Sequence, residues 1–280
     1  MMNFKLVISK LALISWFVTG MVTAQQLPDL TRVTPKYLNI LMNNMDEEST
    51  HTVYSKAEIG IRIHTFRHFN DTSATDTSAV FKTITEAAEY FKQSGLSFYG
   101  AGFHVHPHTG FFEIKDTIAI QQMEDLFTVN NQINVFLVEK LTLDSIEGCG
   151  LTFYPDKPGK NTIILRNSYY TPTDLARMLG HFLGLLTTCN TFGGIEMVAG
   201  DNCNKSGDFL CDTYADGGML NLVNDKCEYM GQSTDPRGKI HVPSVANIMS
   251  EAPNRCRCVF SREQIRRMQF YYSKYRYYLR

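Results

Sequence analysis

No cysteine precedes Cys149 in this chain of 280 residues, and all seven lie between Cys149 and Cys258. A thiolate from the first half of the chain therefore cannot cap a metal. The chain also lacks an excess of either charge, because its net charge is -1. This balance argues against nucleic acid or an anionic membrane as a partner. We find no internal repeat and no low-complexity linker, so the length favours one large domain with at most a small appendage.

The only long apolar run stands at the amino terminus, where Lys5 and Lys10 precede or border residues 11–22 and Ala24 follows them. Residues 1–24 are therefore predicted to be a secretory signal, cut after Ala24. An uncleaved anchor is the alternative, but the run is shorter than the roughly 20 residues of a membrane span. We expect a secreted, periplasmic or extracellular chain with disulfides and no later membrane span. Seven cysteines leave an odd thiol, for which Cys149 is the candidate.

Alternating and helical patterns divide the rest of the chain. Residues 25–54 are polar and irregular, with a short helix at "KYLNILMNNM", and read as a leader or pro-like segment. Strands are expected at "IGIRIHTFRHF", "LSFYGAGFHVHPH", "INVFLVEKL" and "NTIILRN", and residues 70–78 as an exposed loop. An amphipathic helix is expected at "TITEAAEYFKQSG", with Thr83 or Thr85 as its cap. The order predicts an α/β (α+β) domain, with a mixed twisted sheet and helices against it.

A second helix opens at "TPTD", where Thr171 is the expected cap, Pro172 the first helical residue and Asp174 a favourable acid in the first turn. It continues into "RMLGHFLGLLT". Gly180 and Gly184 each cost roughly 1 kcal/mol in a helix interior. We therefore expect close packing at Gly180 and a left-handed exit at Gly184.

Residues 188–247 lose all clear periodicity and hold four cysteines, so this segment is expected to be functional or cross-linked. The chain then ends in a helix that Ser261 and Gln264 cap reciprocally. We expect this Tyr/Arg-rich helix to pack on the domain rather than to bind nucleic acid.

Several motifs together resemble the pappalysin family of metzincin zinc metallopeptidases. "GHFLGL" is similar to the second half of that family's HExxHxxGxxH helix, "CNKSGDFLCDT" to its Gly-Asp and Asp-Thr segment, "NIMS" to its Met-turn, and "GCGLTFYP" to the strand before the helix. The resemblance covers roughly residues 55–270. It implies a metzincin-like domain over residues 55–280, with an upper subdomain (55–187), an active-site helix, and an irregular disulfide-linked lower subdomain (188–280).

The resemblance also implies roles for single residues. Met249 takes the Met-turn position. Cys227 with Cys256 is the first choice of disulfide, and Cys203 with Cys211 or Cys189 the second. The edge strand that pairs with an extended peptide in family members corresponds here to Gly150, Leu151, Thr152 and Phe153.

The zinc motif itself is degenerate. With His181 as the second histidine, the first ligand position holds Arg177, the general-base position holds Met178, and the third ligand position holds Thr187. A one-turn insertion would place Asn190 there instead. A catalytic zinc needs three protein ligands, a guanidinium has no lone pair to give, and methionine cannot accept a proton. The resemblance therefore predicts a fold without the family's chemistry.

Arg177 needs a counter-charge if it is buried. We expect it to take the electrostatic place of the metal and to pair with an acid of the following loop, among Asp201, Asp208, Asp212 and Asp216. His181 is expected to be a buried or cleft-lining histidine bonded to a neighbour. Those same acids, with backbone carbonyls, are the candidates for a structural calcium, and a solvated loop is the alternative.

A second group of histidines, His104, His106 and His108, recurs at period two and would share one face of a strand. A metal site is one reading, and a solvated strand face interrupted by Pro107 is the favoured one. A site built by His181 with these histidines or with His241 stays open.

We therefore predict a secreted, pappalysin-like pseudopeptidase without catalytic residues or cofactor, which binds a peptide or protein in its cleft by strand addition. One alternative is a working zinc metalloendopeptidase with atypical ligands. The other is a secreted structural or surface protein that uses the fold as a stable body.

Overall fold

Five strands form the main sheet, in the order β2-β1-β4-β8-β7. The first four are parallel neighbours, and β7 pairs antiparallel with β8 at one edge. This computed structural model describes residues 26–51, 56–68, 76–156 and 159–280, so the predicted signal lies outside the described residues. The sheet strands are β1 (Ala57–Phe66), β2 (Leu96–His106), β4 (Ile133–Val138), β7 (Gly150–Thr152) and β8 (Thr162–Arg166). A small second sheet contains β3 (Glu113–Ile114), β5 (Lys140–Leu143) and β6 (Ile146–Glu147).

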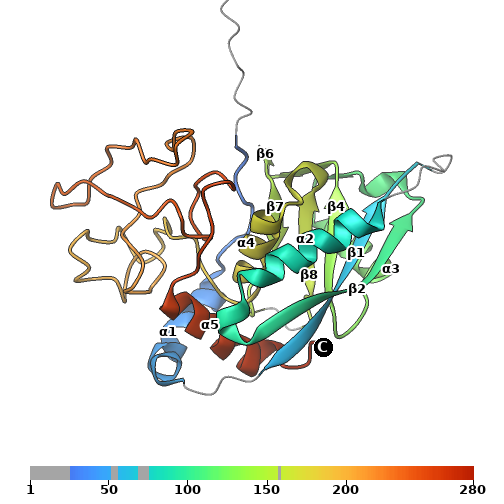
Figure 1. Ribbon diagram of the computed structural model, residues 1–280, viewed down its shortest axis with the longest axis horizontal. Coiled ribbons are helices and arrows are strands. Elements are labelled where there is room, and N and C mark those ends of the chain that lie inside the picture. The colour runs from blue at the N-terminus through green and yellow to red at the C-terminus, as the bar shows by residue number, and fades with distance from the viewer. Residues whose placement is uncertain (1–25, 52–55, 69–75, 157–158) are drawn as a thin grey trace, which may run out of the picture.

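Helices cover both faces of the main sheet, and Figure 1 shows α2 crossing the near face. The helices are α1 (Pro35–Thr50), α2 (Thr77–Glu89), α3 (Thr117–Phe127), α4 (Pro172–Phe182) and α5 (Arg262–Tyr271), with short helical turns η1 (Lys92–Ser94), η2 (Thr109–Phe111), η3 (Asn167–Tyr169) and η4 (Tyr272–Arg276). The predicted α/β class with a mixed sheet and backing helices is confirmed. Among the described helices, none is long and apolar enough to cross a membrane.

The alternation of β1 sends its side chains to two different cores. Ile59, Ile61 and Ile63 face the layer that holds α2 and α4. Phe66 faces the opposite layer, where α3 packs. Residues buried on both sides are what a central parallel strand requires, because helices cover both of its faces.

The helix α2 begins earlier than its pattern indicated. Asp76, and not Thr83 or Thr85, is its cap, and its carboxylate accepts hydrogen bonds from the backbone N–H groups of Ser78 and Ala79. The first turn therefore takes in residues expected to be loop. The polar letters that argued for a loop are those that an exposed first turn tolerates. The helix α3 was not predicted.

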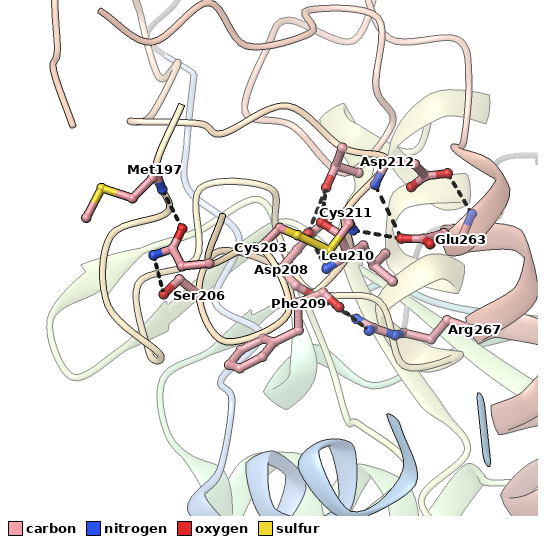
Figure 2. Close-up of a disulfide and its surroundings, with 12 residues drawn as sticks. Met197, Cys203, Ser206, Asp208, Phe209, Leu210, Cys211, Asp212, Glu263 and Arg267 are labelled. Atoms are coloured by element: carbon pink, nitrogen blue, oxygen red, sulfur yellow. Dashed lines mark hydrogen bonds between the residues drawn. A yellow bond between two sulfur atoms is a disulfide. The ribbon is translucent and has the colours of Figure 1, made fainter. Parts of the chain in front are cut away.

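After α4 the chain is irregular up to α5, and this part lies to one side of the sheet in Figure 1. Two disulfides cross-link it, Cys203–Cys211 and Cys227–Cys256. Cys149, Cys189 and Cys258 are free thiols. Figure 2 shows the first disulfide above Arg267 of α5, which donates hydrogen bonds to the carbonyls of Asp208 and Phe209.

Candidate functional site

The helix α4 forms as its local sequence predicts. The Thr171 hydroxyl accepts a hydrogen bond from the Asp174 backbone N–H, and Pro172 stands in the first turn. A side chain at Gly180 would meet the Met249 sulfur at 2.7 Å, so the backbone of α4 lies directly on Met249. Gly184 follows the helix with φ +96°, a conformation that favours glycine. Gly180 is thus closely packed, and Gly184 has the left-handed conformation expected at the helix end.

The four motif positions have different surroundings in the structure. Arg177 and His181 are one turn apart and buried, with 5% and 1% of their surfaces exposed. Met178 is buried in the main apolar core. Thr187 is half-buried beyond the helix, and Asn190 accepts a hydrogen bond from the Phe192 backbone N–H.

The acid that compensates Arg177 comes from the leader. Asp29 Oδ2 lies 2.8 Å from His181 Nε2 and 3.5 Å from Arg177 Nε. The prediction that Asp201, Asp208, Asp212 or Asp216 would pair with Arg177 is therefore wrong. The reason is geometric, because Asp29 lies beside Arg177 and His181 of α4, whereas the loop after α4 packs against α5 through residues such as Asp208 and Cys211.

Burial alone would raise the pKa of the Asp29 carboxyl, but His181 and Arg177 outweigh it and hold that pKa well below its usual range. Asp29 Oδ1 accepts a hydrogen bond from the Thr31 backbone N–H at 2.7 Å. Asp29 is therefore a carboxylate at any ordinary pH, and it supplies the negative charge that two neighbouring basic side chains need.

Each of the two basic side chains also contacts a backbone carbonyl. Arg177 Nη1 donates to the Ser250 carbonyl at 2.6 Å. His181 Nδ1 lies 2.7 Å from the Leu185 carbonyl and 3.2 Å from the Tyr154 hydroxyl. A carbonyl can only accept, so Nδ1 carries a hydrogen when that bond forms. These contacts hold both side chains in place beside Asp29.

The leader reaches this point as an extended strand along the free edge of β7. Asp29 and Gly150 form a parallel bridge, in which the Leu30 N–H donates to the Gly150 carbonyl at 2.9 Å. The Cys149 N–H donates to the Pro28 carbonyl at 2.9 Å. The edge predicted to take an extended peptide, Gly150–Thr152 with Phe153 beyond it, is thus occupied by the chain's own leader.

Side chains complete this contact. The Thr152 N–H donates to the Thr31 hydroxyl at 3.0 Å. Leu30 is buried, and a side chain at Gly148 would collide with it. A cavity of only about 30 Å³ remains between residues 26–29 and the helix α4. The leader therefore fills the groove beside β7.

The helix α1 anchors the same leader at a second place. Tyr37 is fully buried, donates its hydroxyl hydrogen to the Gly184 carbonyl at 2.5 Å and stacks on Tyr154 with ring centroids 4.4 Å apart. Farther along α1, Glu48 forms a buried ion pair with Arg267 at 2.8 Å. In residues 26–51 the leader is thus packed as part of the domain.

The zinc site that the resemblance implies does not fit these residues. By that resemblance His181 is the only retained ligand position, and its Nε2 lies 2.8 Å from Asp29 Oδ2. Within the described ranges, no group of three or more His, Cys, Asp and Glu side chains is gathered in a way that could hold a metal ion. We derive no hydrolytic step for this site.

The loop acids lie elsewhere and have different partners. Asp201 pairs with Arg237, Asp212 accepts from Ser261, and Asp216 accepts from Thr188. Asp208 is 1% exposed, and its Oδ2 has no hydrogen-bond partner. Glu196, which the sequence did not single out, is also buried with a bare Oε2.

Burial, with repulsion from Asp208, raises the pKa of Glu196 to about 8. Burial likewise raises the pKa of Asp208 to about 7, although Arg267 opposes this. Two buried carboxyls near each other without a cation between them favour the protonated form. In this corner, unlike in the groove, burial therefore opposes the charged form of both carboxyls.

The histidines of β2 gather with one that the sequence did not group with them. His64 Nδ1 lies 3.0 Å from His106 Nε2, and His64 Nε2 lies 3.1 Å from Asn134 Oδ1. His104 stacks near both, whereas His108 lies past the end of β2 and bonds the Gly110 N–H. The register His64↔His104 between parallel β1 and β2 is the signal that would have found His64.

No carboxylate faces this group in the contacts of β1, β2 and β4. Burial lowers the pKa of His64 and of His106 to about 4. The rings are therefore neutral at ordinary pH. His241 lies apart, bonded to Ser233, so these histidines and His181 do not form one site.

The comparisons with known proteins identify the fold. No family model and no curated protein matches the chain. Mirolysin, solved in complex with compound 9, is similar over 76% of this chain and 91% of its own, at 16% identity and a TM-score of 0.52. The chain has a metalloprotease fold. Metalloproteinase-II from Bacteroides fragilis is similar at 17% identity over 58% of this chain and 49% of its own, with a TM-score of 0.34.

Proposed function

We propose that this chain is a secreted, catalytically inactive relative of pappalysin-type metallopeptidases that binds an extended peptide along β7. The observation that carries the proposal is the position of Asp29, whose carboxylate lies between His181 and Arg177. A metzincin would hold zinc and a general base on this face of the helix. Here a carboxylate meets a guanidinium, and Met178 at the base position is buried in the core.

Without a zinc site, the edge strand β7 could still bind a peptide. The groove along β7 accepts an extended segment through backbone hydrogen bonds at Gly150 and Cys149. Backbone bonds of this kind supply affinity in strand addition, and side-chain pockets supply selectivity. In the resting chain the leader occupies this edge, so an outside peptide binds by exchange with residues 26–33.

Two measurements test this function. The chain secreted from its natural signal is incubated with protein substrates, with and without added zinc, and we expect no cleavage that a chelator suppresses. Amide hydrogen exchange at Cys149 and Thr152 then follows the edge, since the leader protects both N–H groups. Zinc-dependent cleavage would overturn the inactivity. In a chain whose leader is weakened by Leu30→Ala, a peptide that binds without slowing exchange at either amide would overturn the strand addition. The structural-protein alternative predicts no peptide binding at all.

We also propose that calcium binds between Glu196 and Asp208. Each presents a bare buried carboxylate oxygen, and calcium prefers oxygen ligands. Backbone carbonyls of the same loop would have to complete the ligand set. A bound cation there would stabilise the irregular region and would supply no chemistry to the groove.

A further inference from the structure

Asp29, Asp174 and Glu251 are acids that line the groove beside β7 together with Arg177. Arg177 is permanently charged and 5% exposed. Among the described ion pairs, Arg177 has one with Asp29 alone. Asp174 is engaged elsewhere, because its Oδ1 lies 2.5 Å from Arg257 and its Oδ2 accepts from Thr171. Asp29 is thus the carboxylate on which Arg177 depends.

The leader has a natural division between what is anchored and what can leave. From Thr34 onward it is fixed, because the Thr34 hydroxyl donates to Asp156, and Tyr37 is fully buried. Before Thr34 the segment is extended and is held by the hydrogen bonds along β7, the Asp29 charge contact and buried Leu30. These contacts keep α1 in place when a competing peptide displaces residues 26–33, as the proposed exchange requires.

Without residues 26–33, Arg177 would lose its ion pair with Asp29 and would be open to water. An unpaired buried charge is strongly unfavourable, so a segment that refills the groove and buries Arg177 again is stable there only if it places an anion where Asp29 lies. A neutral peptide could form the backbone bonds of β7 but would leave the guanidinium unpaired. The charge pattern therefore selects among extended peptides.

We propose that the ligand of this groove is an extended segment of another protein with an aspartate followed by an apolar residue, as in the leader's own Pro28, Asp29 and Leu30. This inference rests on the strand addition proposed above and specifies which peptides would bind. The aspartate pairs with Arg177 and His181, and the apolar residue fills the space beside Gly148. A pocket of about 340 Å³, lined by Gln26, Tyr169, Arg255 and Arg257 among others, gives room for the residues that precede the aspartate.

The test uses the full mature chain with a weakened leader, Asp29→Asn with Leu30→Ala. The probe is a labelled peptide of the leader sequence, QLPDLTRV, and its matched control is QLPNLTRV. We expect the aspartate peptide to bind about tenfold tighter or more, because only it neutralises buried Arg177. It should also slow amide exchange at Cys149 and Thr152. Adding Arg177→Met to the same chain should abolish the preference.

The outcomes distinguish failure of this inference from failure of the proposed strand addition. Equal affinity of the two peptides, with protection of both amides, overturns the acidic preference and leaves strand addition intact. Failure of both peptides to protect Cys149 and Thr152 overturns strand addition as well. Concentration-dependent dimers of the unaltered chain that exchange leaders would overturn the separate partner in favour of a second copy. If the double variant does not fold, Leu30→Ala alone keeps Asp29, and the same preference is expected at weaker affinity.

Discussion

The groove and the corner near Cys203 show two ways in which this chain handles buried charge. In the groove, Arg177 and His181 meet the carboxylate of Asp29, and the pKa of that carboxyl falls well below its usual range. In the corner, burial raises the pKa of Glu196 to about 8 and that of Asp208 to about 7, although Arg267 opposes the rise at Asp208. The first site carries its own counter-ion within the chain. The carboxylate oxygens Glu196 Oε2 and Asp208 Oδ2 in the second have no hydrogen-bond partner.

The histidines of β1 and β2 are a third case, with bases in place of acids. His64 and His106 lack a facing carboxylate and lose their protons instead, with pKa values of about 4. Charge of one kind, once buried, is thus either paired or removed by titration.

The largest expected effect comes from removing the counter-ion in the groove. Asp29→Asn keeps the shape of the side chain but leaves Arg177 buried and unpaired, so we expect a loss of about 3 to 5 kcal/mol in the free energy of unfolding. Urea denaturation measures this loss. The matched control is Asp29→Asn with Arg177→Met, which removes both charges and should restore most of the stability. If the single variant is as stable as the unaltered chain, the ion pair is not what holds the leader.

Calcium bound at Glu196 and Asp208, as proposed above, should have the next largest effect. Calcium at 100 times its dissociation constant should raise the free energy of unfolding by about 3 kcal/mol. Glu196→Gln with Asp208→Asn should show no such gain, because both carboxylates are gone. Thermal unfolding with calcium, and with magnesium as control, makes the comparison. An equal calcium gain in both chains would place the cation elsewhere.

The histidine pair should give a smaller effect that depends on pH. His64 titrates near 6.5 when unfolded and near 4 when folded, so the unfolded chain binds its proton first. Stability contributed by neutral His64 is therefore complete well above pH 6.5 and falls as the pH drops toward 4, with a loss of roughly 2 kcal/mol at pH 5. Unfolding midpoints measured across this range should decline less in His64→Gln. Parallel curves for the two chains would show that another group causes the decline.

The helix α4 was predictable because its signals are local. Thr171, Pro172 and Asp174 specify its start within four residues, and Gly184 specifies its exit. The strands followed for the same reason, since alternation of apolar residues is visible in a short window. The start of α2 was missed because its polar first turn resembles a loop.

The counter-ion of Arg177 was not predictable from local pattern. The sequence required an acid for a buried arginine, but the partner stands far upstream in a segment without periodicity. One signal was present, since Asp29 is a lone acid between apolar Pro28 and Leu30. The loop after α4, with its many acids, was the nearer and more conspicuous candidate. A pair of residues so far apart in sequence can be identified only once the position of the leader along β7 is known.

The motif register is open to a constructive test. Arg177→His, Met178→Glu and Thr187→His together restore the letters of the zinc helix, and Asp29→Ala removes the competing carboxylate. We expect this chain to gain zinc affinity over the unaltered one, measured by calorimetric titration. Failure to bind zinc would show that the assigned register, or the backbone behind it, differs from that of a metzincin.

The central claim is that a carboxylate and a guanidinium stand where a peptidase of this fold would hold its metal. The most direct measurement is the metal content of the chain as it is secreted, purified without chelators and analysed by mass spectrometry of the elements. The account predicts far less than one zinc per chain, before and after equilibration with zinc. One tightly held zinc per chain, lost together with His181 in His181→Ala, would contradict it.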